Sequence, residues 1–180
     1  FETLTGFKYL SKVDGLTYGY EEALGYCVAP SSVNDKDGIS AGLILIQLAA
    51  ELKRDGRTIS DLLGEIWARH GFHGTRQISI RTNKLSDIES VMAKVRSTLP
   101  VNLGEFKVTS FDDLAKPKNG LPPTDGVRIW LDDKYRVIVR PSGTEPKIKC
   151  YIEVTAKDEM SAKPILDLIE GEFRELMKVA

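Results

Sequence analysis

Apolar residues recur along the chain with two different periods, and these periods predict its helices and strands. Residues 39–54 are apolar on most sides, which predicts a helix buried between other elements and ended by Gly56. Residues 59–67 place apolar side chains at i, i+3, i+4, i+7 and i+8, the spacing of one helical face. Thr58 and Asp61 have the spacing of a capping box at its start, and Gly71 ends it.

The second half of the chain mixes both periods. Ile78 and Ile80 alternate with polar residues, as in a half-exposed strand. A helix is predicted over residues 86–99, with a capping box at Ser86 and Glu89. Alternation at 127–131 and 136–140 around a DDK turn predicts a hairpin, and 148–154 a further strand. A last apolar stripe over 165–177 predicts a helix with Pro164 in its first turn.

These elements divide the chain into two units, 1–74 and 75–180, joined by a glycine-containing hinge at 71–74. In the first unit, short strands are predicted at 7–10 and 18–20. The second unit reads strand, helix, strands, helix, which is typical of an α+β domain with a small antiparallel sheet and two helices.

Composition narrows the classes of partner. The 180 residues are 42% hydrophobic and 28% charged, as in ordinary globular proteins, and the net charge is −1. This balance argues against nucleic acid as the main partner. The longest apolar run, 41–50, is too short to span a membrane. Two lone cysteines, Cys27 and Cys150, favour reduced thiols and a cytoplasmic location. Because residue 1 is Phe rather than Met, we expect a chain processed or cut from something longer.

Residues 140–149, RPSGTEPKIK, combine a fixed cation, hydroxyls and a glycine between two predicted strands. This density is typical of a phosphate-binding nest, in which guanidinium, hydroxyl and backbone N–H groups share the phosphate oxygens. The alternative is a plain strand connection shaped by Pro141, Gly143 and Pro146. Lys147 and Lys149 share the strand face that points away from the core, so they also suit ordinary surface positions.

Four segments together resemble one enzyme family. RPSGTEPKIKCYIEV, starting at residue 140, resembles the phosphate-binding loop in the last domain of the α-D-phosphohexomutases, the superfamily of phosphoglucomutases and phosphomannomutases. FETLTGFKYL at 1–10, YEEALGY at 20–26 and DKDG at 35–38 resemble, in order and spacing, the sugar-binding segments of the third domain. The pairing of EEALGY with DKDG is most similar to the branch of phosphopentomutases and glucose-1,6-bisphosphate synthases.

The resemblance implies a fold and a set of ligand-binding residues. Residues 1–74 are expected to be an α/β fragment of the third, sugar-binding domain, and 75–180 the α+β phosphate-binding domain. Thr5 and Gly6 match the T-G-[WF]-K segment, Glu21 the carboxylate that accepts two sugar hydroxyls, and Lys36 a ligand-contacting lysine. The matches to the phosphate site are Arg140, Ser142, Gly143, Thr144 and Lys149. From the residues alone, Glu21 also suits a surface acid, and Lys36 an ion pair with Asp35 or Asp37.

Two positions depart from the commonest family pattern, G-E-x-S-x-G. Tyr20 stands in the place of the first glycine and Ala23 in the place of the serine. The missing hydroxyl bears on how the sugar hydroxyl pair is recognised, and therefore on which sugar phosphate is the substrate.

The family's catalytic groups do not occur in this sequence. The resemblance implies a phosphoserine donor in an S-H-N-P-type loop and Mg²⁺ in a D-G-D-x-D-R loop, and neither string is present. We therefore expect no catalytic or metal-binding residue here. The chain is expected to be the C-terminal part of a mutase that works through a sugar bisphosphate, with N-terminal mutase domains of the same polypeptide as its partner. The alternative is a stand-alone, non-catalytic module that binds a phosphosugar.

Overall fold

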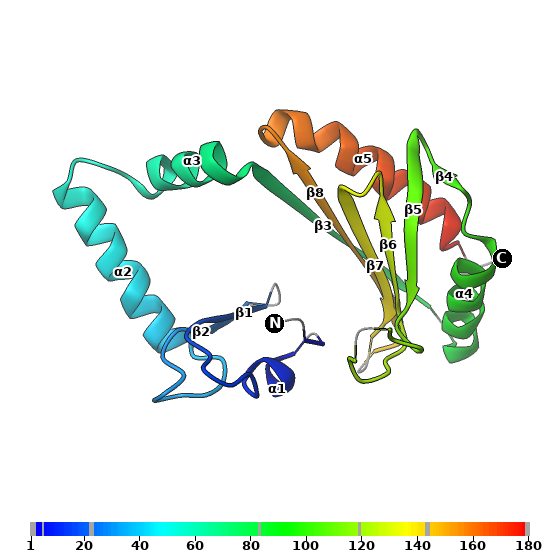
Figure 1. Ribbon diagram of the computed structural model, residues 1–180, viewed down its shortest axis with the longest axis horizontal. Helices are drawn as coiled ribbons and strands as arrows, with labels where there is room; N and C mark the ends of the chain where they lie inside the picture. Colours follow the sequence, from blue (N-terminus) through cyan, green and yellow to red (C-terminus); the bar gives the residue numbers. More distant parts are fainter. Residues whose placement is uncertain are drawn as a thin grey trace. The chain divides into compact units, whose positions relative to one another are not determined.

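The chain forms two compact units, residues 1–65 and 66–180, in a computed structural model that describes residues 3–4, 6–21, 24–82, 84–118, 120–142 and 145–178 (Figure 1). No helix of the described residues is both long enough and apolar enough to cross a bilayer.

The first unit contains a short helix, a small hairpin and longer helices. Its elements are α1 (Phe7–Leu10), β1 (Gly19–Glu21), β2 (Gly25–Cys27), α2 (Gly38–Arg54) and the first part of α3 (Ile59–His70). The strands β1 and β2 are antiparallel, with Glu21 opposite Gly25. The helices predicted at 39–54 and 59–67 are confirmed, as is the capping box: Thr58 Oγ1 accepts from the Asp61 N–H, and Asp61 Oδ2 accepts from the Thr58 N–H.

The strand predicted at residues 7–10 is wrong, because these residues form α1. Gly6 has φ 119°, and its carbonyl accepts hydrogen bonds from the N–H groups of Tyr9 and Leu10, which closes a helical turn. Of this turn, Phe7 is the buried residue. Four residues are too few to show either period clearly, so the pattern was ambiguous.

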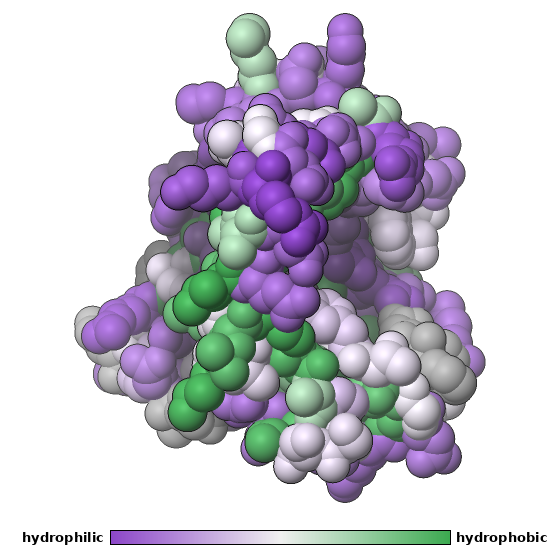
Figure 2. Space-filling model, turned by 90° about the vertical axis from the view of Figure 1, so that its left-hand side faces the viewer, coloured by the Kyte–Doolittle hydropathy of each residue, from purple (hydrophilic) through white to green (hydrophobic). Residues whose placement is uncertain are grey.

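Burial of α2 was also predicted wrongly. Figure 2 shows the side on which α2 lies in Figure 1, and apolar side chains gather on this surface. Leu43 and Ile46 of α2 are 64% and 67% exposed. Of the whole helix, Leu52 alone is buried. The described residues of this unit form a sheet of two three-residue strands, which is too small to cover a 17-residue helix.

The second unit is a six-stranded antiparallel sheet in the order β3-β8-β7-β6-β5-β4. Its elements are β3 (Phe72–Arg81), α4 (Leu85–Thr98), β4 (Asn102–Leu103), β5 (Phe106–Asp113), β6 (Val127–Leu131), β7 (Tyr135–Pro141), β8 (Lys147–Ala156) and α5 (Glu159–Leu176). The predicted α+β architecture and the hairpin at 127–140 are confirmed.

One face of the sheet carries the core. The helices α4 and α5 lie on one face of the sheet (Figure 1), and alternate residues of the strands are buried with the apolar stripes of both helices. The sheet contributes Ile78, Val127, Ile129, Val137, Val139, Ile148, Cys150 and Ile152, and the helices Val91, Met92, Val95, Ile169 and Phe173. The intervening strand residues lie on the opposite face, which we call the open face; it carries charged, polar and aromatic side chains.

Several element ends differ from the sequence prediction. β3 begins at Phe72, so residues 72–74 already pair with β8; the boundary at 74 and the hinge at 71–74 stay predictions. Asp87, not Glu89, accepts the capping bond from the Lys84 N–H, so α4 begins before Ser86. α5 begins at Glu159 after the Asp158 cap, which places Pro164 beyond the first turn.

Candidate functional site

In the first unit, a carboxylate and an ammonium group meet at the end of the hairpin. Glu21 is the last residue of β1, and its Oε1 lies 3.0 Å from Lys36 Nζ. The Glu21 side chain is 10% exposed and that of Lys36 48%. The Lys36 ammonium also lies 5.9 Å from the centre of the Phe7 ring. Lys36 therefore forms its ion pair with Glu21, a partner that the sequence did not suggest, and not with Asp35 or Asp37.

Gly25 makes this arrangement possible, and sequence reasoning gave it no role. A Cβ at Gly25 would lie 2.4 Å from Glu21 Cγ, 2.5 Å from Phe7 Cε2 and 2.9 Å from Lys36 Cδ. Only a residue without a side chain lets the three groups approach β2 this closely. Its position directly across from Glu21 in a tight hairpin was the available signal.

The turn that presents Lys36 is held at both ends. The Asp37 N–H donates to the Tyr26 carbonyl at 2.9 Å, which ties the turn to β2. The Asp37 side chain caps α2 by accepting from the N–H groups of Ile39 and Ser40. Hydrogen bonds from the Ser40 side chain and the Ile39 N–H hold the pKa of Asp37 below its usual value. Lys36 therefore projects from a fixed backbone.

The remaining residues predicted for the sugar-binding part are only partly visible. Gly6 begins α1 with a positive φ that favours glycine. Thr5 lies outside the described residues, as does Ala23. The structure therefore brings together Glu21 and Lys36, and leaves the role of the Thr5–Gly6 segment a prediction.

In the second unit, Arg140 lies near the end of β7, opposite Lys149 of β8. Its Nη2 lies 3.4 Å from the Tyr151 hydroxyl, and its guanidinium carbon lies 5.6 Å from the centre of the Tyr151 ring. The Nε of Arg140 is buried and has no hydrogen-bond partner among the described residues. A buried guanidinium N–H without an acceptor is costly, and a bound anion would supply the acceptor.

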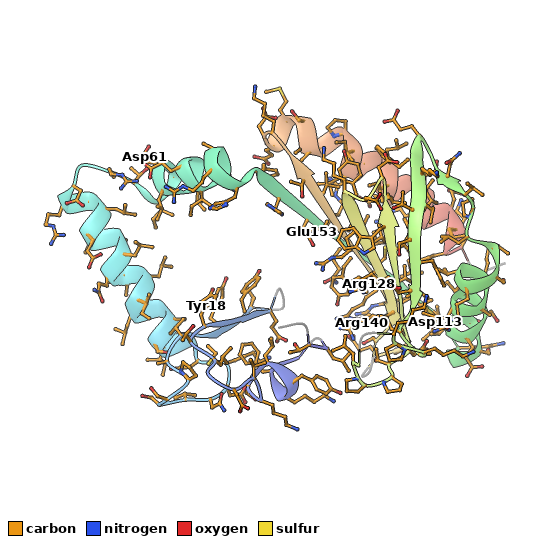
Figure 3. All side chains as sticks on the ribbon, viewed as in Figure 1. Tyr18, Asp61, Asp113, Arg128, Arg140 and Glu153 are labelled. Carbon is orange, nitrogen blue, oxygen red and sulfur yellow. The ribbon has the colours of Figure 1, made fainter. Side chains whose placement is uncertain are left out.

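The other arginines on this part of the sheet are neutralised. Arg128 of β6 donates to Asp112, with its Nη2 3.0 Å from Oδ2, and Arg136 of β7 is paired with Glu153. Figure 3 shows Arg128, Glu153 and Arg140 on the same sheet, with Arg140 toward the end that carries the loop. Within the described ranges, Arg140 has no carboxylate partner. It therefore keeps its positive charge available to a ligand.

The loop after Arg140 folds back on itself through backbone hydrogen bonds. The Ser142 N–H donates to the Lys147 carbonyl at 2.8 Å, and the Lys147 N–H donates to the Glu145 carbonyl at 2.8 Å. Gly143 and Thr144, both predicted to bind phosphate, lie outside the described residues. The described ends of the loop thus hold Ser142 beside the strand pair, next to Arg140.

Lys147 and Lys149 differ in their surroundings. Lys147 forms an ion pair with Glu145, and its side chain is 16% exposed. The hydrogen bond from Lys147, with its charge, holds the pKa of Glu145 below its usual value. Lys149 lies half-buried on the open face, like Arg140, and has no hydrogen bond or ion pair among the residues described. Of these two lysines, Lys149 is therefore the one whose charge no described carboxylate neutralises through an ion pair.

Thr82 is a further residue that sequence reasoning missed. It is a buried polar residue whose N–H donates to the Pro146 carbonyl at 3.0 Å. Its hydroxyl shares one proton between the carbonyls of Lys84 and Pro146, at 3.1 and 3.3 Å. These bonds attach the far end of the loop to the residue after β3. The available signal was a threonine directly after a strand, where a hydroxyl often bonds to backbone.

Comparison with known proteins places both parts of the chain in one family. Residues 1–70 match the sequence model of the phosphoglucomutase/phosphomannomutase alpha/beta/alpha domain III, and residues 79–163 that of the phosphoglucomutase/phosphomannomutase C-terminal domain. The two matched segments lie in the predicted order.

Individual relatives carry the same names. The chain is 41% identical to a probable phosphomannomutase of Haemophilus influenzae over 98% of its own length and 36% of the relative's. It is 33% identical to a phosphoglucomutase of Staphylococcus epidermidis, covering 93% of the chain and 34% of the relative. The chain thus spans about a third of the length of these relatives.

A solved structure shares the fold. It is the open form of the exocytosis-sensitive phosphoprotein pp63/parafusin, a phosphoglucomutase from Paramecium, with a TM-score of 0.64 and 19% identity. The likeness covers 91% of this chain and 30% of that one. Taken together, the two domain matches and the named relatives show that the chain belongs to the phosphoglucomutase/phosphomannomutase family, the α-D-phosphohexomutases, and represents its C-terminal portion.

Proposed function

We propose that this chain supplies sugar and phosphate binding to a phosphosugar mutase. The whole enzyme would move phosphate between C1 and C6, or C5, of a sugar phosphate through a bisphosphorylated intermediate. In that scheme a phosphoserine outside this chain gives its phosphoryl group to the free hydroxyl of the substrate. The bisphosphate then returns its other phosphoryl group to the serine.

The observation that carries the proposal is the unneutralised guanidinium of Arg140. Its neighbours Arg128 and Arg136 are paired with carboxylates, whereas Arg140 keeps a buried Nε without a described acceptor. A planar guanidinium suits the oxygens of a phosphate, which it can bind through two parallel N–H groups. Ser142 and Lys149 lie beside it in sequence and register, and we propose that they, with Gly143 and Thr144, complete the phosphate contacts.

Glu21 suits the recognition of sugar hydroxyls. One of its oxygens accepts from Lys36, which fixes the carboxylate, and an ionised carboxylate has further acceptor capacity on both oxygens. We propose that Glu21 accepts from two neighbouring hydroxyls and that Lys36 also reaches the ligand. We extend the proposal to Thr5 and Gly6 on the family pattern alone.

The metal requirement is proposed for the rest of the enzyme. No group of three or more His, Cys, Asp or Glu side chains that could hold a metal ion occurs among the described residues. We propose that Mg²⁺ and the phosphoserine belong to N-terminal domains of the same polypeptide. The exposed apolar face of α2 supports such a partner, because large apolar patches usually mark contact surfaces.

We also propose a cytoplasmic location and the branch of phosphopentomutases and glucose-1,6-bisphosphate synthases. Cys27 and Cys150 are both free and buried, and burial raises the pKa of the Cys150 thiol, so neither is arranged for a disulfide framework. The branch rests on the pairing of EEALGY with DKDG. Ribose 1-phosphate, glucose 1-phosphate and mannose 1-phosphate, titrated separately, would rank the substrates.

Calorimetric titration of the chain with these sugar phosphates tests the proposal. We expect saturable binding that Arg140→Ala weakens by about 10- to 100-fold, the cost of a charge-assisted contact. Arg69→Ala is the matched control, because this exposed arginine also has no carboxylate partner among the described residues. Equal losses in both variants, or no binding by the unmodified chain, would refute the assignment.

A further inference from the structure

The Arg140 side chain contacts an aromatic residue, Tyr151, which lies within the RPSGTEPKIKCYIEV segment but received no role from the sequence. Tyr151 lies on β8 opposite Ile138 of β7, and Arg140 lies opposite Lys149. Tyr151 and Arg140 are therefore diagonal neighbours on the open face of the sheet. At this spacing, Cβ atoms are within reach of long and aromatic side chains.

Two contacts join the pair. The guanidinium carbon lies 5.6 Å from the ring centre, within the range of a cation–π interaction. One terminal nitrogen, Nη2, donates to the phenol oxygen at 3.4 Å. Together they engage the ring face and the polar tip of Tyr151, and they leave Nε without a described partner.

We propose that Tyr151 is a positioning residue, which holds the Arg140 guanidinium in the orientation that binds phosphate. An arginine side chain has many rotamers, and most of this freedom must be lost before two parallel N–H groups can meet one phosphate. An arginine on an open face without such a contact would be free to turn toward solvent. Tyr151 restricts the Arg140 side chain and leaves its charge unneutralised, whereas a carboxylate partner would neutralise it.

The contrast with Arg136 supports this reading. Arg136 lies on the same strand and the same face, but Glu153 of β8 neutralises it. Its partner stands directly across the ladder, whereas Arg140 faces Lys149 there and reaches diagonally to Tyr151. One strand pair thus holds one arginine by a carboxylate and the other by an aromatic ring.

The inference rests on the proposed phosphate-binding function, so its test has two separate readouts. The first is the order parameter of the Arg140 Nε–H in ¹⁵N NMR relaxation, which needs no ligand. We expect Tyr151→Leu to lower it, and Tyr151→Phe, which keeps the ring, to retain most of it. Trp130→Leu removes another aromatic residue of the open face and should leave it unchanged.

The second readout is the dissociation constant for inorganic phosphate and for glucose 1-phosphate, measured on the same chains. We expect Tyr151→Leu to weaken both by about 3- to 10-fold, Tyr151→Phe by less, and Trp130→Leu not at all. Circular dichroism melts show whether each variant folds; the Phe variant retains the test if the Leu variant does not fold.

The outcomes separate the two ideas. Normal Arg140 order or normal affinity in Tyr151→Leu, with weakened affinity in Arg140→Ala, overturns the role of Tyr151 alone. Normal affinity in Arg140→Ala overturns the proposed function and, with it, any role of Tyr151 in phosphate binding. A larger loss in Tyr151→Phe than in Trp130→Leu assigns part of the effect to the phenol hydroxyl and supports the inference.

Discussion

Glu145 and Lys147, two residues apart at the end of the RPSGTEPKIK segment, neutralise each other. The Lys147 side chain is mostly buried. Lys147 contacts Oε2 of Glu145, and Arg81 Nη2 lies 3.7 Å from Oε1 of the same carboxylate. The charges at this end of the loop are thus largely satisfied within the protein. The positive charge left for a ligand lies on Arg140 and Lys149 of the paired strands.

We therefore predict that Lys147→Ala weakens sugar phosphate binding by less than about 3-fold, far less than Arg140→Ala. Lys147→Ala removes a charge that Glu145 already neutralises. Arg140→Ala removes a guanidinium group whose Nε has no described acceptor and which no described carboxylate neutralises. Titration of both variants with glucose 1-phosphate measures the difference. In the longer enzyme, Arg140→Ala should lower kcat/KM in both reaction directions; similar losses at the two positions would contradict this assignment.

The isolated chain should not interconvert sugar phosphates. Its sequence has neither the S-H-N-P nor the D-G-D-x-D-R string, so it should bind without turnover. A coupled assay with glucose 1-phosphate, activating glucose 1,6-bisphosphate and Mg²⁺ checks this at high protein concentration. Conversion that persists after repeated purification, and that Arg140→Ala reduces, would show a catalytic group within these residues.

The sequence predicted the parts of this structure that local spacing determines. The helices α2 and α3 and the 127–140 hairpin follow from uninterrupted apolar periods. β5 was missed because its register shifts between Val108 and Ser110, which breaks the alternation that marks a strand. The exposure of α2 could not be predicted, since a helix's own pattern does not say whether a partner surface is present.

The candidate binding residues of both units divide in the same way. Arg140, Glu21 and Lys36 are visible in the sequence because they stand in recognisable motifs. Their supports are not, because each depends on a neighbour across a strand pair or a turn: Gly25 for Glu21, Tyr151 for Arg140 and Thr82 for Pro146. Such contacts follow from strand register, which spacing along one segment does not fix.

The apolar face of α2 should bind a hydrophobic dye in the isolated chain. Leu43→Gln combined with Ile46→Gln removes two residues that are more than half exposed, so we expect weaker fluorescence of the dye ANS and less self-association, with unchanged helix content. Sedimentation velocity and circular dichroism check the last two. Val101→Gln, at an exposed apolar residue of the second unit, is the control and should change neither dye fluorescence nor self-association. Equal dye binding in both variants would show that the dye reports another surface.

Acid should loosen the contact between α5 and β3. Arg76 Nη1 lies 2.6 Å from Asp167 and 2.8 Å from Glu170. Burial alone would raise the pKa of Glu170, but hydrogen bonds from Arg174 and Arg76 outweigh it and hold the pKa below its usual value. A carboxyl group whose pKa is lower in the folded than in the unfolded protein stabilises the fold at pH values above its unfolded-state pKa. This stabilisation is lost as the pH falls through its folded-state pKa.

We thus expect the free energy of unfolding to fall below about pH 4.5, and to fall less steeply in Glu170→Gln. Urea titrations between about pH 6 and pH 3, followed by tryptophan fluorescence, measure it. Glu105→Gln, at an exposed carboxylate without an ion pair among the described residues, should keep the steeper fall. Parallel curves for the original chain and Glu170→Gln would contradict the role of the Arg76 cluster.

Gly25→Ala and Gly42→Ala should shift stability in opposite directions. A Cβ at Gly25 would overlap Glu21 and Phe7, so we expect a loss of about 1–3 kcal/mol and weaker sugar phosphate binding. A Cβ at Gly42 of α2 meets nothing within 4 Å, and alanine favours the helix, so we expect a gain of about 0.5–1 kcal/mol with unchanged binding. Urea unfolding followed by circular dichroism measures both.

Trp67 and Trp130 belong to the second unit, so the fluorescence transition should stay in place if the effect of Gly25→Ala is confined to the hairpin. A Gly25→Ala variant as stable as the original chain would mean that Glu21 and Lys36 can move away from β2, and that their pairing is not held by close packing.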